Sequence, residues 1–213
     1  MRLLDLSLSS PAENLACDER LLDVAEHGEG GETLRFWESN ETFVVVGYAN
    51  KIETEVNITA CEQRGIPILR RCSGGGTVVQ GPGCLNYALI LKIDSNPELR
   101  NITAANRFIM ERNRTAIQST IHNPQSEIRV QGHTDLTIDG LKFSGNAQRR
   151  RRHFILFHGT FLLNFDLALI SELLPLPSRQ PDYRKSRNHA DFLLNLDLSA
   201  DKVKDALREA WIQ

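Results

Sequence analysis

The chain has 213 residues, of which 41% are hydrophobic and 24% charged, and its net charge is −2. These values are typical of a globular domain with its own core, and they exclude a general attraction to nucleic acid or to anionic membranes. No apolar run approaches the roughly 20 residues that span a bilayer, and the N-terminus has no signal-peptide pattern. The cysteines have no C-x-x-C spacing, which is typical of reduced core residues in a cytoplasmic protein: Cys17, Cys61, Cys72 and Cys84.

The first thirty residues predict a strand followed by a helix. Residues 2–8 have the composition of a strand. A helix should begin at Pro11, because Ser10 can cap it, proline suits the first helical position and Glu13 completes a capping box. Gly28 is a natural end for this helix.

Two strands and a second helix follow. Residues 34–37 and 42–48 are predicted as strands that pair with each other, and the run Val44–Val46 indicates burial on both faces. A helix is expected over about 54–64, with Gly65 at its end. Residues 66–71 then form a strand that leads into the most unusual part of the sequence.

That stretch reads RRCSGGGTVVQGPGCLN and extends from Arg70 to Asn86. The three consecutive glycines of Gly74–Gly76 allow a backbone to approach a ligand closely. The donors of Arg70, Arg71 and Ser73 beside them favour an anion such as a phosphate as the ligand. The alternative is a strained turn or bulge, and on residue chemistry alone the two are evenly balanced. The spacing matches neither a P-loop nor a dinucleotide fingerprint.

The second half of the chain alternates helices with antiparallel strands, so the predicted fold class is α+β with largely antiparallel sheets flanked by helices. Its expected elements are a strand over 85–93, a helix from Asn101 or Thr103 that breaks near 122–126, a strand over 154–163, a short helix capped by Asp166 and an amphipathic helix over 199–212.

Asp139-Gly140 lies between two alternating segments and strongly predicts a hairpin. A two-residue turn pairs Ile138 with Leu141, Thr137 with Lys142, and Leu136 with Phe143. Lys142 then projects from the polar face. A lone lysine there is usually only solvated, but the small residues of Ser144–Ala147 follow at once and could approach a ligand.

Three further features have an ordinary interpretation beside a functional one. His158 in an apolar strand is slightly more typical of a core histidine bonded to a carbonyl than of a catalytic group. Cys72 and Cys84 flank the glycine loop, and we favour packing over a nucleophilic role. The basic run Arg149–His153 is interpreted as a solvated turn rather than a docking patch for an acidic partner.

Several motifs agree in order with one known family. Arg70-Arg71-Cys72-Ser73-Gly74-Gly75-Gly76-Thr77-Val78, with Leu85-Asn86-Tyr87 downstream, resembles the signature of lipoate–protein ligases. Lys142-Phe143-Ser144-Gly145-Asn146-Ala147 is similar to the catalytic-lysine segment of that family, and His158-Gly159-Thr160 to its His-Gly-Thr strand. The likeness extends from about residue 11 to 196. It implies the biotin/lipoate ligase catalytic fold, here as a single domain over residues 1–213 without the C-terminal accessory domain of many ligases.

The resemblance also implies an activity. ATP, with Mg²⁺, would activate lipoate or octanoate as an acyl-adenylate, with Lys142 as the catalytic residue. The acceptor would be a lysine on the lipoyl domain of a 2-oxoacid dehydrogenase subunit or on a glycine-cleavage H-type protein, with or without a separate accessory protein. The implied nucleotide contacts are Arg70, Arg71, Ser73, Gly74, Gly75, Gly76, Thr77, Val78, Asn86 and Asp135, the last also a Mg²⁺ contact. The implied acyl contacts are Val45, Gly75, Gly145, Ala147, His158 and Gly159.

Some residues depart from the family pattern. Gln80 replaces a frequent histidine, and Gly132-His133-Thr134-Asp135 replaces Gly-Arg-Asn-Asp. Two alternatives stay open. A related octanoyltransferase would move the acyl group between carrier proteins without ATP, but it needs a later cysteine than Cys84. A non-catalytic module would bind lipoate or a lipoyl domain, but it would have no reason to keep Arg71 and Lys142.

Overall fold

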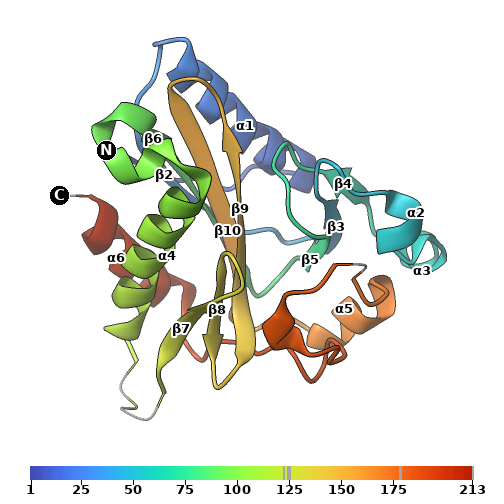
Figure 1. Cartoon of the computed structure of the whole chain (residues 1–213). Helices are drawn as coiled ribbons and strands as arrows, with labels where there is room; N and C mark the ends of the chain where they lie inside the picture. Colours follow the sequence, from blue (N-terminus) through green and yellow to red (C-terminus); the bar gives the residue numbers. More distant parts are fainter. Residues whose placement is uncertain (122, 124–125, 178, 213) are drawn as a thin grey trace.

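The computed structural model describes residues 1–121, 123, 126–177 and 179–212. Strands form two sheets, one of seven strands in the order β1-β2-β6-β10-β9-β8-β7 and one of three in the order β4-β3-β5 (Figure 1). Most neighbours in the large sheet are antiparallel, and helices flank both sheets. The predicted α+β class is therefore confirmed.

The helices and strands have the following bounds: β1 Arg2–Asp5, α1 Pro11–Glu26, β2 Thr33–Trp37, β3 Phe43–Val46, α2 Ile52–Glu55, α3 Ile58–Arg64, β4 Ile68–Arg70, β5 Val78–Gln80, β6 Cys84–Lys92, α4 Ile102–Gln118, β7 Ile128–Gln131, β8 Asp135–Ile138, β9 Leu141–Arg150, β10 Phe154–Leu162, α5 Leu167–Leu173 and α6 Ala200–Trp211. Short 3₁₀ turns cover Ile93–Ser95, Pro97–Arg100 and Asp182–Arg184. Among the described helices, none is long and apolar enough to cross a membrane.

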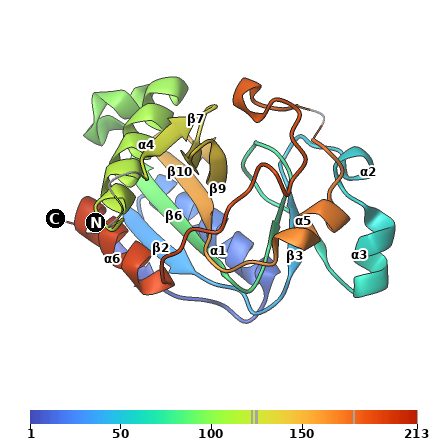
Figure 2. The same cartoon turned by 90° about the horizontal axis from the view of Figure 1, so that it is seen from below.

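The large sheet uses its two faces differently, because successive side chains of a strand point to opposite sides. Odd-numbered residues of β6, such as Leu85 and Leu89, join the main core under α4 and α6. Even-numbered residues, such as Ala88 and Ile90, pack with Leu22 of α1. Helix α1 lies on the face of the sheet opposite α4 and α6 (Figure 2). Towards one end of that second face α1 gives way to the small sheet, and a cavity opens between the two sheets.

The predicted pairing of residues 34–37 with 42–48 is wrong. β2 pairs with β1 and β6 in the large sheet, whereas β3 pairs with β4 and β5 in the small one. The link over residues 38–42 thus crosses from one sheet to the other. Both strands are fully buried, as the valine run of β3 predicts, but burial does not identify the partner strand.

The hairpin at Asp139-Gly140 is confirmed with one change of register. Both turn residues have positive φ, 52° and 74°, as a type I′ turn requires. Thr137 pairs with Lys142 as predicted, but a bulge then places Leu136 opposite Ser144 instead of Phe143. An extra residue in one strand increases local twist and redirects the side chains that follow.

Several element bounds also differ from the predictions, and the helix expected over about 54–64 is two helices, α2 and α3. Helix α4 ends at Gln118, ahead of the expected break near 122–126, and residues 122 and 124–125 lie outside the described part of the chain. The basic run is not a solvated turn throughout, because Arg149 and Arg150 belong to β9. Arg150 donates to the carbonyl oxygen of Leu99, and Arg151 pairs with Asp23 of α1.

Candidate active site

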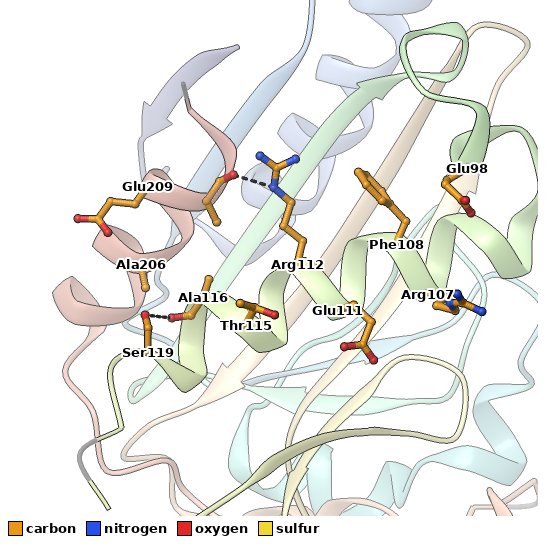
Figure 3. Close-up of a pocket in the computed structure, with 11 residues that line it drawn as sticks. Glu98, Arg107, Phe108, Glu111, Arg112, Thr115, Ala116, Ser119, Ala206 and Glu209 are labelled. Carbon is orange, nitrogen blue, oxygen red and sulfur yellow. Dashed lines mark hydrogen bonds between the residues drawn. The ribbon is translucent and has the colours of Figure 1, made fainter. Parts of the chain in front are cut away.

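Two hollows of similar size differ sharply in the chemistry of their walls. One, of about 740 Å³, lies between α4 and α6 and is lined by helix-face residues such as Phe108 and Ala206 (Figure 3). In it Arg112 turns toward the end of α6 and donates to the carbonyl oxygen of Ala210 at 2.7 Å. The other, of about 780 Å³, lies between the two sheets and contains the glycine loop and Lys142. The second cavity is therefore the candidate active site.

Most of the predicted site residues come together in this cavity. Those that line it are Val45, Arg71, Gly74, Gly75, Gly76, Thr77, Val78, Asn86, Asp135, Lys142, Gly145, Ala147, His158 and Gly159. Arg70 and Ser73 do not line it. Arg70 is exposed elsewhere, and Ser73 is fully buried beneath the loop.

The two arginines brace two neighbouring loops, Arg71 the glycine loop and Arg70 the loop after β3. Arg71 donates to the carbonyl oxygens of Gly74 and Gly76, both at 2.7 Å. Arg70 donates to three carbonyl oxygens in the loop after β3, over residues 47–50. Burial lowers the pKa of Arg71 to about 10, so its guanidinium stays charged at neutral pH. Because the Arg71 bonds use backbone carbonyls of the glycine loop, the side chain of Arg71 holds that loop in its shape.

Gly47 explains how the two loops approach each other. A Cβ atom added there would lie 2.2 Å from the carbonyl oxygen of Gly75, a contact that no side chain can make. Gly75 itself has φ +86°, a region that favours glycine. The sequence signal of three glycines therefore reflects a backbone that is packed tightly against a second loop.

Lys142 is part of a half-buried polar chain and is not freely solvated. Its Nζ lies 2.8 Å from Oδ1 of Asp135, and Tyr183 donates its hydroxyl to Oδ2 of the same carboxylate at 2.7 Å. Burial and the charge of Asp135 raise the pKa of Tyr183, so the phenol remains a donor. A Cβ at Gly145 would come within 2.7 Å of Lys142 Nζ, so the glycine makes room for the ammonium group.

Residues of neighbouring strands in the large sheet form the floor of the cavity. The register of the strands places these residues in two rows. Trp37, Asn86, Thr160 and Gly145 are successive partners across β2, β6, β10 and β9. Ala88, His158 and Ala147 form the next row. Partners in register share a face. The side chains of Asn86, Thr160 and His158 therefore rise from one surface, with small residues between them and Lys142.

His158 has a different partner from the one expected. Its Nε2 lies 2.5 Å from the hydroxyl oxygen of Ser73, and its Nδ1 lies 3.6 Å from Oδ2 of Asp18. Arg71 Nε donates to the same hydroxyl at 3.1 Å. The histidine thus connects helix α1 to the glycine loop, and it lines the cavity instead of lying in the core.

A buried ion pair that no sequence pattern indicated lies below this histidine. Arg35 and Asp18 are 0% and 2% exposed and lie 2.6 Å apart. Arg35 also donates to both oxygen atoms of Asn14, and Trp37 donates to the second oxygen of Asp18. Each partner lies in a different element, so no local spacing could have predicted the contact.

A hydrogen-bond chain that the sequence also did not indicate crosses the core from α6 to the loop before β8. Trp211 donates to Asn113, Asn113 to the hydroxyl of Tyr87, Tyr87 to Asn146, and Asn146 to the carbonyl oxygen of Thr134. Gly159 permits the step across β10, because a Cβ there would overlap the Asn146 amide. Gly159 therefore lines the cavity with backbone atoms alone. The side-chain amide of Asn146 occupies the space, on the α4 face of the sheet, where a side chain at position 159 would lie.

The residues present in the cavity fit a nucleoside triphosphate bound together with magnesium. The glycine-loop amides and Lys142 supply donors for phosphate oxygens, and two buried amide groups in the cavity have unpaired atoms. Within the described ranges, no cluster of three or more metal-ligating His, Cys, Asp or Glu side chains is present. Mg²⁺ commonly binds through one or two carboxylates plus substrate phosphates, and the carboxylate of Asp135 lines this cavity beside Lys142.

With this geometry in place, the family can be stated. The chain belongs to the lipoyl protein ligase A/B catalytic domain family, whose sequence model matches residues 10–212. This confirms the resemblance drawn from the glycine-loop, lysine and histidine motifs.

The individual relatives carry two kinds of name. Octanoyltransferase LipM of Geobacillus kaustophilus is 29% identical over 99% of this chain and 84% of its own length. Octanoyltransferase LipM of Anoxybacillus flavithermus is 30% identical over 88% of this chain and 74% of its own length. Among solved structures, a lipoate-protein ligase A bound with ATP superposes with a TM-score of 0.80 at 27% identity. The match covers 99% of this chain and 83% of that chain. A bi-partite lipoate protein ligase from Thermoplasma acidophilum, described with its E2 lipoyl domain, superposes with a TM-score of 0.81 at 25% identity. The match covers 99% of this chain and 81% of that chain.

Proposed function

We propose that this protein activates lipoate or octanoate with ATP and transfers the acyl group to a lysine of a lipoyl domain. The observation that carries the proposal is the content of the cavity. It combines a braced glycine loop with the Lys142–Asp135 pair, whereas none of the four cysteines, all in the described part of the chain, lines it. These are groups for stabilising phosphate and carboxylate charge, not for forming a thioester.

Each residue has a defined task in this proposal. Bound ATP supplies the phosphorus that turns the carboxylate into a good acyl donor. The amides of Gly74–Gly76 hold phosphate oxygens, and Arg71 keeps the loop in shape. Lys142 lies against the oxygens on which negative charge develops, and Asp135 orients the ammonium group and provides a Mg²⁺ ligand. The acyl chain follows the floor past Gly145 and Ala147 toward His158 and Val45.

The cysteines support the proposal in a second way. Burial raises the pKa of Cys72 to about 11 and that of Cys84 to about 12. The pKa values of Cys17 and Cys61 are raised for the same reason. A thiol is a nucleophile only as its thiolate, so these four are unsuited to an acyl-enzyme intermediate at neutral pH.

A second candidate function is transfer of an octanoyl group between two carrier proteins without ATP. It is favoured by relatives that are named octanoyltransferases. Their alignments cover 99% and 88% of this chain. The acceptor proposed for both functions is a lipoyl domain or an H-type protein, and the Thermoplasma ligase supports the first of these. That bi-partite ligase also supports a separate accessory chain as a further partner.

A variant with all four cysteines replaced by alanine tests the two functions. We expect acylation of a lipoyl domain from octanoate and ATP to persist within about twofold, because no step uses a thiol. Acylation would be followed by intact mass, with folding checked by circular dichroism. Single variants of Cys72 and Cys84 provide the same test if the quadruple variant is unstable. Loss of acylation in a folded variant, or acylation only from an octanoyl-carrier thioester, would contradict the proposal.

A further inference from the structure

The segment between α5 and α6 lies against the start of β9, the strand that carries Lys142. Lys142 forms an isolated parallel bridge with Leu193. Its amide donates to the carbonyl oxygen of Phe192 at 2.9 Å, and its carbonyl oxygen accepts from the amide of Leu194 at 3.0 Å. The backbone of the lysine is therefore held by a distant part of the chain.

The same segment also reaches the side chain of Lys142, through one carboxylate. Tyr183 donates its hydroxyl to Oδ2 of Asp135 at 2.7 Å, and Oδ1 of that carboxylate lies 2.8 Å from Lys142 Nζ. The side chains of Lys142 and Asp135 are only 23% and 14% exposed. Because both oxygens have a partner, the carboxylate cannot turn without breaking a contact. The tyrosine hydroxyl thus fixes the orientation in which Asp135 faces the ammonium group.

The ring of Tyr183 is itself held by two neighbours. Phe192, which is 3% exposed, lies beside it with ring centroids 5.3 Å apart. A Cβ atom added to Gly132 would lie 3.4 Å from Cε1 of Tyr183, so the turn before β8 also packs against the ring. Since Phe192 binds the amide of Lys142 as well, one residue connects the backbone of the lysine to the tyrosine.

Tyr183 does not line the cavity, whereas Asp135 and Lys142 both do. Its hydroxyl can therefore act on the reaction only through the carboxylate that it binds. A group that stabilises developing charge must be held within about 0.5 Å of its productive position. The long side chain of a lysine is flexible, so it depends on such support.

We propose that Tyr183 is a positioning residue, which holds Asp135 so that the ammonium group of Lys142 stays beside Gly145 in the cavity floor. The inference rests on the role proposed for Lys142 in the acyl transfer. It adds a residue outside the cavity on which that role depends.

The test is Tyr183→Phe, which removes the hydroxyl and keeps the ring beside Phe192. The kcat for acylation of a lipoyl domain from octanoate and ATP should fall about 10-fold, the scale of a lost hydrogen bond to a charged group. The KM values for octanoate and ATP should stay within about twofold, because only the positioning of a transition-state contact is lost.

A double-variant cycle separates positioning from a merely structural role. In a Lys142→Ala background, Tyr183→Phe should change the acylation rate by less than about twofold, because no ammonium group remains to be oriented. An equal fall in both backgrounds would overturn the inference.

The matched control is Tyr48→Phe, which removes the hydroxyl of a tyrosine that is 60% exposed and lies outside the cavity. Its kcat should equal that of the wild type. A kcat for Tyr183→Phe within about twofold of the wild type would overturn the inference. Pyrophosphate release by the wild type in that case would leave the proposed function standing.

A second measurement does not depend on turnover. The ¹⁵N NMR signal of the Lys142 ammonium group can be assigned by its absence from Lys142→Ala. It should be sharp in the wild type and in Tyr48→Phe, because a hydrogen-bonded ammonium group exchanges its protons slowly, and broadened or shifted in Tyr183→Phe. If the wild type releases no pyrophosphate, this signal alone decides the inference. Its absence from the wild type, or an unchanged signal in Tyr183→Phe, would overturn it.

Discussion

Replacing Lys142 with alanine should lower the rate of lipoyl-domain acylation by about 10²–10³-fold, the usual effect of removing one group that stabilises transition-state charge. Lys142 Nζ lies 2.8 Å from Asp135 and directly beside Gly145 in the cavity floor. No other lysine among the described residues lines the cavity. The loss should fall on kcat, because the ammonium group acts mainly on charge that develops during the reaction.

The matched control is Lys202→Ala, which removes an exposed lysine from α6 far from the cavity. Both variants would be compared in a steady-state acylation assay after circular dichroism confirms their fold. Turnover of the Lys142 variant within a few-fold of the wild type would show that the lysine is incidental to the chemistry.

Arg35→Met should lower the free energy of unfolding by about 3–5 kcal/mol, the cost of breaking a fully buried ion pair. The change leaves the carboxylate of Asp18, which is 2% exposed, without the guanidinium group that pairs with it. It also removes the donors that bind both oxygens of Asn14. Urea denaturation at neutral pH would measure the loss.

A surface ion pair provides the control for this prediction. Arg64 and Glu172 are 49% and 39% exposed, so Arg64→Met should cost only about 0–1 kcal/mol. The double variant Asp18→Leu/Arg35→Met should recover much of the stability lost by Arg35→Met, because no unpaired buried charge remains. Similar losses for Arg35→Met and Arg64→Met would contradict the account of the buried pair.

The features predicted well from sequence are those encoded within a few residues. Ser10 accepts from the amide of Glu13, and the Glu13 carboxylate accepts from the amide of Ser10, as the capping box predicts. Asp139-Gly140 forms the expected turn because only a few residue types adopt positive φ at both positions. The motifs of the site also retain their order, and most of the residues they contain line one cavity.

The features that sequence did not predict depend on contacts between distant residues. The partners of β2 and β3 depend on which sheet each strand joins, and both strands are fully buried. The Asp18–Arg35 pair joins a helix to a strand, and Asn146 reaches Tyr87 only because Gly159 lacks a side chain. Such contacts leave no periodic pattern in the sequence. The roles assigned to the individual site residues remain predictions.

Pyrophosphate release is the direct readout of ATP-dependent activation of the acid. The purified protein would be given octanoate or lipoate, ATP and Mg²⁺, first alone and then with a lipoyl domain. Pyrophosphate should form only when both acid and ATP are present, and the acceptor should gain the mass of one acyl group. Absence of pyrophosphate in every mixture, together with acylation of the same acceptor from an octanoyl-carrier thioester, would contradict ATP-dependent activation.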